Sequence, residues 1–340
     1  MITDRLKIYR EREPVHWHKP SGAWLVTRFD DVARLLADRR LTSRTLQAHV
    51  ENFPGLDQRE RTDLANFFGN WLSLTDGARH SDLRGFVAPI LAPSRIAPWA
   101  AHFEEMANEQ ASRADLGRVE LSFARPYAAA VIGAVLGLTA DETARALTAT
   151  AKLVGVLGPG DVDEHRAHAA RKALDDVSEL VARAIGGPAR TVGPDSLLRG
   201  TDLPDELQVA LFVQFVGGGY DPLARCITAY ALSEQSAQQR RFSDDLVDEV
   251  IRLYGPFELL PRIALQPIEI GSHRLQEGSR VLLAIGSANR DESQFPDSSM
   301  MRPSRPVRHL AFGGGPHRCP ATSLARPAVR AAVRALMPSL

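Results

Sequence analysis

The sequence predicts a mainly helical protein with a smaller β region, an α+β fold, and two observations carry this prediction. Apolar residues with helical spacing dominate from about residue 91 to residue 232, in segments separated by Gly and Pro. Strand-like alternation is confined to the start of the chain and to the stretch after Arg262, where Gly271 and Gly278 separate short apolar runs. We see no repeat and no domain boundary, so we expect one domain over residues 1–340.

The individual elements follow from these periodicities. Trp24, Val26 and Phe29 have the alternation typical of a short strand. Val32, Leu35 and Leu36 follow with helical spacing. Thr139 and Asp161 are expected to begin two of the later helices, because their side-chain oxygens can accept first-turn N–H groups. Residues 285–318 are rich in Gly, Asn, Asp, Ser and Pro, which favours a long ordered loop.

The composition is that of a globular protein without a strong overall charge. Of the 340 residues, 44% are hydrophobic and 24% charged, enough to form a core without disulfides. The 41 basic and 41 acidic side chains cancel, so no overall field attracts nucleic acid or an anionic membrane. The chain begins with charged residues, and no apolar run approaches the roughly 18 residues of a membrane span. We therefore expect a cytoplasmic monomer that binds neither nucleic acid nor membrane.

The strongest chemical signal is a glycine-rich loop that contains a cysteine, HLAFGGGPHRCPATSLAR at residues 309–326. Glycines 313–315 allow positive φ angles and a close approach of the backbone to a flat ligand. Cys319 precedes a helix expected to begin near Ala321, whose free N–H groups and dipole favour a thiolate. The alternative for such a loop is a small buried cysteine beside a glycine turn. The second cysteine, Cys226, lies in a different context, so we expect no disulfide.

The spacing within this loop resembles that of a known family. The F-G-x-G-x-H-x-C signature of cytochromes P450 is matched by Phe312, Gly313, Gly315, His317 and Cys319. LAR at residues 324–326 is similar to the continuation in bacterial members, although Ala321 replaces a common glycine. The resemblance implies the P450 fold, a soluble bacterial-type protein and haem b bound to Cys319, with Phe312 near the sulfur. A thiolate ligand donates electrons to the iron and favours O–O cleavage.

The resemblance also implies partners around the cofactor. Glu249 and Arg252 form the family's E-x-x-R pair, and Arg302 stands where a third member would complete a buried network that holds the cysteine loop. Haem propionates need cationic or hydrogen-bonding partners. The residues that match those partners are His80, Arg84, Arg262 and His317.

The segment GGYDPL at residues 218–223 matches the distal-helix motif A/G-G-x-D/E-T with one departure. Gly218 and Gly219 would leave room for dioxygen and substrate, and Asp221 stands at the position of the acid. Pro222 replaces the threonine whose hydroxyl normally steadies iron-bound oxygen. Because proline lacks an N–H, we expect a kinked or widened turn here. These four residues are the candidate catalytic residues.

Pro222 leaves several reactions open. Water held by the kink and by Asp221 would preserve ordinary monooxygenation. A carboxylate or hydroxyl of the substrate would instead favour oxidative decarboxylation or desaturation, and peroxide would replace dioxygen in a third reaction. A non-catalytic haem sensor, or a degenerate P450 that binds a carrier protein, is the alternative from another class. The family usually continues with a strand hairpin that reaches the pocket, whereas this sequence ends at Leu340, so we expect a more open pocket or a shortened sequence.

The resemblance suggests a small or peptide-derived natural product of a biosynthetic pathway as substrate. Apolar candidates for its pocket are Tyr220, Phe257, Leu259 and Leu260. A ferredoxin or flavodoxin is expected to dock by charge near four arginines, of which the last three share a helical face. These are Arg318, Arg326, Arg330 and Arg334.

Overall fold

The computed structural model describes residues 6–44, 50–157, 161–186, 194, 196–201, 203–236, 241–306 and 308–337. Its α-helices are α1 (Lys7–Arg12), α2 (Phe29–Leu36), α4 (Gln58–Gly69), α5 (Gly77–Ile90), α6 (Pro93–Ile96), α7 (Trp99–Ala111), α8 (Arg125–Leu136), α9 (Ala140–Gly155), α10 (Glu164–Gly186), α11 (Asp205–Ala231), α12 (Asp244–Tyr254), α13 (Ile285–Ala288) and α14 (Thr322–Leu336). Its strands are β1 (Val15–His18), β2 (Ala23–Val26), β3 (Leu41–Thr42), β4 (Leu260–Ala264), β5 (Ile268–Ile270), β6 (His273–Leu275) and β7 (Arg280–Leu283). The predicted mainly helical fold with a smaller β region is confirmed.

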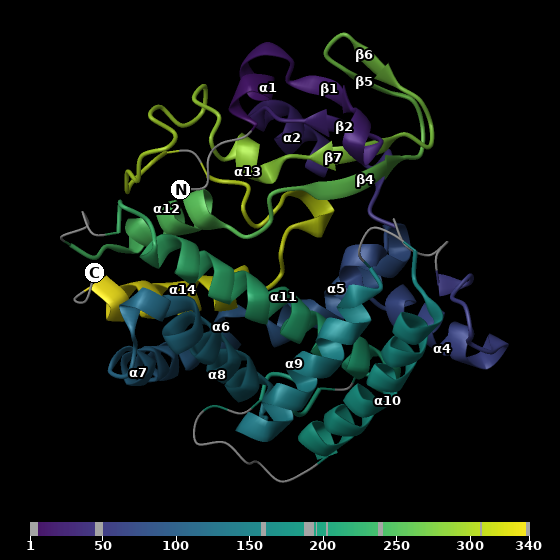
Figure 1. Cartoon of the computed structure of the whole chain (residues 1–340), viewed down its shortest axis with the longest axis vertical. Helices are drawn as coiled ribbons and strands as arrows, with labels where there is room; N and C mark the ends of the chain where they lie inside the picture. Colours follow the sequence, from purple (N-terminus) through teal and green to yellow (C-terminus); the bar gives the residue numbers. More distant parts are fainter. Residues whose placement is uncertain are drawn as a thin grey trace.

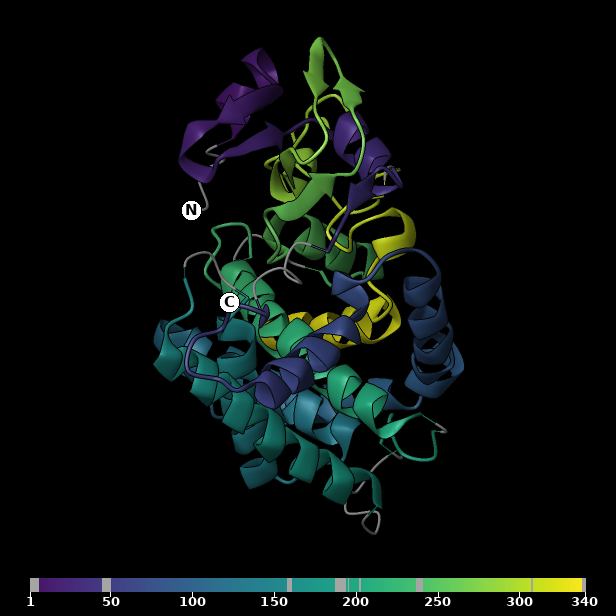
Figure 2. The same ribbon diagram turned by 90° about the vertical axis from the view of Figure 1, so that its right-hand side faces the viewer.

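The β region lies at one end of the molecule, above the helical part (Figures 1 and 2). Its five-stranded sheet has the order β1-β2-β7-β4-β3, in which β2 and β7 are parallel and the other pairs antiparallel. The first and last parts of the chain therefore share one sheet. Strands β5 and β6 form a separate hairpin beside it.

The register of the sheet gives the β region a core of its own. Val26 of β2 lies opposite Leu283 of β7, and both side chains are fully buried. Val32 and Leu35 of α2 belong to the same cluster, so the predicted strand followed by a helix closes over the sheet. Phe29 is an exception, because it begins α2 and does not extend the strand.

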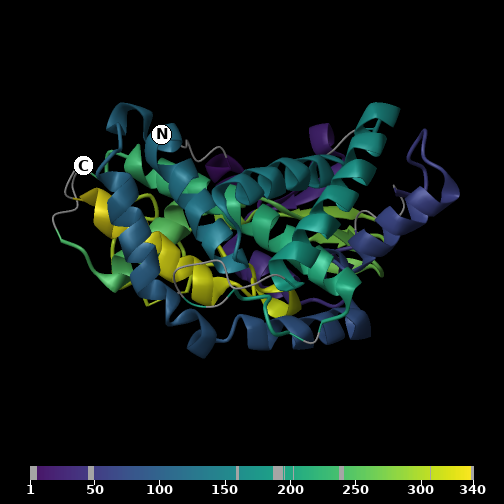
Figure 3. The same ribbon diagram turned by 90° about the horizontal axis from the view of Figure 1, so that it is seen from below.

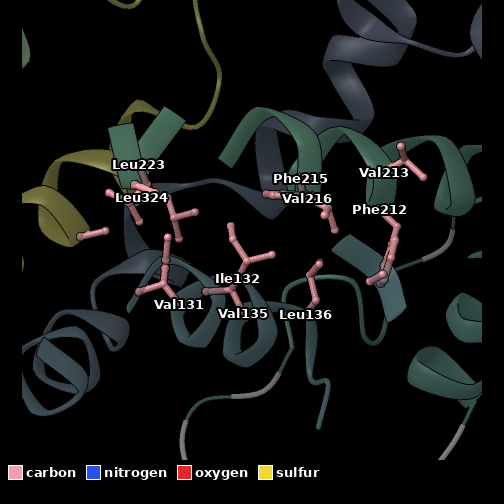
Figure 4. Close-up of a cluster of buried hydrophobic side chains, with 14 of the residues drawn as sticks. Val131, Ile132, Val135, Leu136, Phe212, Val213, Phe215, Val216, Leu223 and Leu324 are labelled. Carbon is pink, nitrogen blue, oxygen red and sulfur yellow. The ribbon is translucent and has the colours of Figure 1, made fainter. Parts of the chain in front are cut away.

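The helical part is built around α11, which packs on α8, α9, α12 and α14. Figure 4 shows the contact between α8 and α11, where side chains such as Ile132 and Val216 interdigitate, with Leu324 of α14 beside Leu223. Viewed from below, α4 and α10 lie at one end of the molecule, and α7 and α14 at the other (Figure 3). α11 thus lies at the centre of the helical part.

The predicted helix starts are right in one case and displaced in the other. Thr139 caps α9 in a capping box with Glu142, each side chain accepting a backbone N–H of the other residue. At α10 the cap is Asp163, whose Oδ1 accepts the amide of Arg166 at 2.8 Å. Asp161 instead offers its backbone carbonyl to the Arg166 side chain at 3.0 Å, so the prediction for Asp161 was wrong by two residues.

In the described parts of the chain, no single helix has the length and apolar character of a membrane span. One bent pair, Glu120–Leu136 with Ala140–Gly155, meets the criteria of length and composition together, with an angle of 101° at the break.

Candidate functional site

The loop that carries Cys319 is fixed by its own backbone and by the start of α14. The Cys319 amide donates to the Phe312 carbonyl at 2.8 Å, which closes the loop. The Cys319 carbonyl accepts the hydroxyl of Thr322 at 2.9 Å. α14 begins at Thr322, so Cys319 lies just before a helix N-terminus, as the sequence predicts.

The glycines of the loop have two different roles. Gly313 and Gly315 adopt φ angles of 69° and 60°, which side chains other than glycine rarely tolerate. A Cβ atom on Gly315 would also collide with the backbone of Leu36 and, at 2.7 Å, with Cα of Ala37. The close approach seen at Gly315 is therefore to the end of α2, which ties the cysteine loop to the β region.

Opposing influences act on the Cys319 thiol. Burial raises its pKa, while the Ala321 amide and the guanidinium groups of Arg84 and Arg318 act in the opposite direction. A cation at the sulfur would reverse the effect of burial, because it favours the thiolate. Burial alone raises the pKa of Cys226 to about 12.

His80 and His317 meet beside the loop, although they are far apart in the sequence. Their ring centroids are 4.3 Å apart. Nε2 of His317 lies 2.9 Å from Oδ1 of Asp76. Burial opposes the ionisation of Asp76, but hydrogen bonds from His317 and Thr42 lower the pKa of Asp76 to about 2. Burial, helped by His317 and Arg84, lowers the pKa of His80 to about 4, so its ring is neutral at pH 7.

One polar group at this place lacks the partner that burial requires, and a second donates only to a neighbouring carbonyl. Nε2 of His80 is buried without a hydrogen bond. Arg262 of β4 is 7% exposed, and the one hydrogen bond recorded for its guanidinium goes to the carbonyl of Pro261. Burial lowers the pKa of Arg262, and the charge of Asp76 offsets this only in part. Arg84, four residues after His80 on α5, donates to the carbonyl of Arg318 at 2.8 Å in the cysteine loop.

These residues fit the haem that the resemblance implies. Haem b would need a soft anionic ligand for the iron and donors for two propionates, and Cys319 lies near donors from α5, β4 and its own loop. The unpaired Nε2 of His80 and the buried guanidinium of Arg262 are where such acceptors would bind. Cys319 would hold the iron, and His80, Arg84, Arg262 and His317 the propionates.

Replacing Arg262 by Met is expected to accelerate haem loss from the purified holoprotein about tenfold to hundredfold. A charged hydrogen bond contributes about 1.5–3 kcal/mol, and methionine keeps the volume without the charge. Transfer of haem to excess apomyoglobin, followed by absorption, measures this rate. Arg280→Met, on the exposed side of neighbouring β7, serves as control, and equal rates for both variants would contradict a propionate role.

The predicted Glu–Arg–Arg network exists, but its third member is a different arginine. Arg252 is bidentate to Glu249, with Nε 2.7 Å from Oε1 and Nη2 2.9 Å from Oε2. Arg305 completes the network through Nε, 3.1 Å from Oε2 of Glu249. The prediction for Arg302 was wrong: its side chain is 57% exposed and pairs with Asp297, and only its backbone amide donates to Glu249, at 2.8 Å.

The network anchors the irregular segment that leads to the cysteine loop. Arg252 donates to the carbonyls of Asn289 and Ser298, both at 2.7 Å, and Arg305 to that of Pro296, also at 2.7 Å. Burial opposes the ionisation of Glu249, but the hydrogen bonds and charge of Arg252, with the donors of Arg302 and Arg305, together lower its pKa. The long loop predicted before the cysteine is thus ordered by side chains from α12.

The distal helix segment is continuous, without the widened turn expected at Pro222. A Cβ atom on Gly218 would meet nothing within 4 Å, so this side of α11 is open. Pro222 follows one turn later on the same face. On Gly219 the Cβ would strike Ile132 of α8, so Gly219 serves helix packing and adds no room for a ligand.

Asp221 and Tyr220 are turned towards α8. The carboxylate of Asp221 lies 3.5 Å from both Arg125 and Arg225. The guanidinium of Arg125 lies 5.9 Å from the ring centroid of Tyr220, and hydrogen bonds with Tyr220 and Glu120 raise the pKa of Arg125. Tyr220 is therefore directed away from the open side of Gly218, which does not support its predicted place in the pocket.

The other pocket candidates divide into two groups. Phe257 and Leu259 are 48% and 40% exposed, high values for apolar side chains beside a buried network. Leu260 instead begins β4 and packs on the core of the β region. Phe257 and Leu259 remain the apolar candidates.

Three of the four arginines expected to bind an electron donor form ion pairs within the chain. Arg326 binds Asp248 at 2.9 Å, and Arg330 binds Asp244 at 2.7 Å. Arg334 lies 3.4 Å from Glu104 of α7. Arg318 is exposed, and the described residues hold no acidic partner within ion-pair distance of its side chain.

Several residues of the site were not found from the sequence. Arg305 lies three residues after Arg302, so spacing alone does not decide which arginine reaches Glu249. Asp76 stands at the N-cap position of α5, but its carboxylate makes no cap and binds Thr42, Ser43 and His317 instead, contacts that no local pattern indicates. Arg125 had no local signal either, since its contact with Asp221 arises only from the packing of α8 on α11.

Comparison with known proteins identifies the family and the fold. A family model described as Cytochrome P450 matches residues 227–338. The 6-deoxyerythronolide B hydroxylase of Saccharopolyspora erythraea is 31% identical over 92% of this chain and 82% of its own length. The polyketide biosynthesis cytochrome P450 PksS of Bacillus subtilis is 25% identical over 97% of this chain and 86% of its own. The crystal structure of CalO2 has the same fold, with a TM-score of 0.84 at 24% identity, covering 97% of this chain and 86% of that one.

Proposed function

The chain belongs to the cytochrome P450 family, whose members bind haem b through a cysteine thiolate, and on that premise we propose that this monooxygenase-type oxidoreductase tailors a small or peptide-derived natural product, with Cys319 as its iron ligand. The observation that carries the proposal is the buried, unpaired Nε2 of His80, together with the buried guanidinium of Arg262, beside the Cys319 loop. The substrate class is supported by the names of the two curated relatives, which concern a hydroxylase and polyketide biosynthesis.

The bound haem would supply activation of dioxygen for transfer of one oxygen atom to the substrate. The chain's own residues hold the cofactor from the edge and position the substrate on the open side of Gly218. Phe257 and Leu259 offer it an apolar wall.

Proton delivery is where this chain departs from its family. Pro222 has no hydroxyl and cannot donate an N–H to the carbonyl of Gly218. Asp221 is held by Arg125 and Arg225, which leaves its carboxylate less free to order water near Gly218. A water molecule bound to the Gly218 carbonyl would preserve hydroxylation. A polar group of the substrate at the same carbonyl would favour oxidative decarboxylation or desaturation, and this second candidate rests on the geometry of Pro222.

Restoring the hydroxyl with Pro222→Thr separates these candidates. If water fills the position, we expect the variant to keep the same product and to couple electron use to product better than the wild type. If the substrate supplies the group, turnover should fall about tenfold or more, within the range of one proton-transfer contribution. The measurement is product formed per NADPH consumed, with ferredoxin and reductase. A Pro222→Ala variant controls for loss of the proline alone, and identical coupling in all three proteins would contradict any role of residue 222 in proton delivery.

A ferredoxin or flavodoxin is proposed as electron donor, docking close to Arg318. Arg308 is a second exposed cation that lines the same surface hollow as Arg318. With Arg326, Arg330 and Arg334 paired internally, this narrower pair of cations is the better candidate for an acidic donor.

The reaction class is tested by mass spectrometry of products from candidate polyketide and peptide intermediates. Gain of one oxygen atom supports hydroxylation, and loss of carbon dioxide or of two hydrogens supports the second candidate. A reduced carbon monoxide complex of the wild type without the red-shifted Soret band of a haem thiolate would contradict both.

A further inference from the structure

We propose that Asp248 is a positioning residue for the cysteine loop, acting through His309 and Arg326 on the ring of Phe312. Asp248 precedes Glu249 on α12 and takes no part in the Glu249–Arg252–Arg305 network. The inference rests on the proposed role of Cys319 as the iron ligand. It adds a second connection from α12 to the loop, directed at Phe312.

Phe312 is the residue through which such a connection would reach Cys319. Its carbonyl accepts the Cys319 amide at 2.8 Å, so a shift of Phe312 moves the backbone of the cysteine directly. The His309 ring lies 5.7 Å from the Phe312 ring, centroid to centroid, at an angle of 43°. On α14, the guanidinium of Arg326 lies 5.9 Å from the centroid of Phe312, within the range of a cation–π contact.

One carboxylate oxygen joins these two neighbours of Phe312. Oδ1 of Asp248 lies 2.9 Å from Nη2 of Arg326 and 3.7 Å from Nε2 of His309. Nδ1 of His309 accepts the amide of Ala311 at 3.2 Å, so the proton of a neutral ring is on Nε2, the atom that faces Asp248. The acid on α12 therefore fixes the ring orientation of His309 and the position of Arg326 together.

Burial makes this arrangement sensitive to the loss of Asp248. The His309 side chain is 6% exposed, and its Nε2, like Nε of Arg326, is buried without a closer hydrogen-bond partner. The interactions with His309 and Arg326 lower the pKa of Asp248, while burial acts in the opposite direction. The net effect is a lower pKa, so the carboxylate is ionised at pH 7. Removing its charge leaves the two groups without an anion, and we expect both to move away from Phe312.

The chain provides a matched control on the same helix. Asp245 lies three residues before Asp248 and lines the same surface hollow beside Phe312. It is exposed and accepts a hydrogen bond from Ser304, with no recorded contact to His309, Arg326 or Phe312. Asp245→Asn therefore removes an equal charge from the hollow and leaves the contacts of Phe312 intact.

The test uses the holoprotein and compares Asp248→Asn with Asp245→Asn. The readout is the rate at which the reduced carbon monoxide complex loses its red-shifted Soret band at a fixed temperature, with far-ultraviolet circular dichroism as a separate measure of unfolding. We expect about tenfold faster loss of the band in Asp248→Asn, the effect of one charge-assisted interaction, and a rate within about twofold of wild type in Asp245→Asn. The midpoint potential of the haem reports the purely electrostatic effect, which both variants share.

Equal rates of band loss in the two variants would overturn the proposal. If Asp248→Asn does not fold, two variants of His309 test the proposal. His309→Gln keeps an N–H donor and should retain the band, whereas His309→Ala should lose the band about as fast as expected for Asp248→Asn. Wild-type rates in both His309 variants would also overturn it. A wild-type protein without the band contradicts the ligand assignment of Cys319, a failure that is distinct from that of the Asp248 proposal.

Discussion

Replacing Cys319 by Ala is expected to abolish the red-shifted Soret band of the reduced carbon monoxide complex and to eliminate turnover with ferredoxin and reductase. The methyl side chain cannot coordinate iron, and the electron donation that favours O–O cleavage disappears with the sulfur. Difference spectra of reduced protein with and without carbon monoxide measure the first effect, and product formation the second. Haem content is determined on the same sample, because the propionate partners are unchanged and can still retain some haem.

The control is Cys226→Ser, at the only other cysteine. Cys226 is fully buried in α11, and burial raises its pKa to about 12, which opposes a thiolate there. We expect this variant to be less stable, since a buried hydroxyl lacks a partner, yet to keep the red-shifted band. A band that persists in Cys319→Ala and vanishes in Cys226→Ser would reverse the assignment of the ligand.

Replacing Glu249 by Ala is expected to lower the free energy of unfolding by about 3–5 kcal/mol. The change leaves Arg252, which is almost completely buried, without its counter-charge, and such unpaired charges have that cost. It also removes the acceptor for Arg305 and for the amide of Arg302, so the segment before the cysteine loop loses its anchor. Urea unfolding followed by circular dichroism gives the free energy, and absorption of the haem shows whether the cofactor is lost first.

Two arginine variants provide the comparison for Glu249. Arg305→Ala should destabilise the protein by more than about 1 kcal/mol, because the Arg305 side chain is 10% exposed and donates to three carbonyls. Arg302→Ala should stay within about 0.5 kcal/mol of wild type, since its side chain is exposed. The opposite order would restore Arg302 as the third member of the network.

The same network gives stability a defined dependence on pH. The pKa of Glu249 is lower in the folded than in the unfolded chain, where the ordinary value is 4.5, so its contribution is fully present well above that value. The contribution is lost as the pH falls below 4.5 through the folded pKa. The Glu249→Ala variant should therefore lose less stability than wild type between pH 5 and pH 3, by about the contribution of this one carboxyl. An equal loss in both proteins would show that other groups dominate acid unfolding.

The helical part and the cysteine loop were accessible from the sequence because their signals are local. Helical spacing in α8 to α11 reflects apolar faces that pack on one core, and the N-cap at Thr139 needs only a residue three positions away. The order of glycines around Cys319 is likewise contained in one short segment. Asp163 in place of Asp161 shows the limit of local signals, since two acids close together offer the same cap and the fold selects one.

The sequence by itself determined the family, the class of fold and the cysteine loop, because each depends on residue type and short spacing. The tertiary structure decided which of two arginines reaches Glu249, that Gly219 faces Ile132 rather than a ligand, and that Asp221 is held by Arg125. It also brought Asp248, His309 and Arg326 together around Phe312. These contacts join segments that are distant in the chain, and their energies depend on burial and on distances between side chains, which no local pattern records.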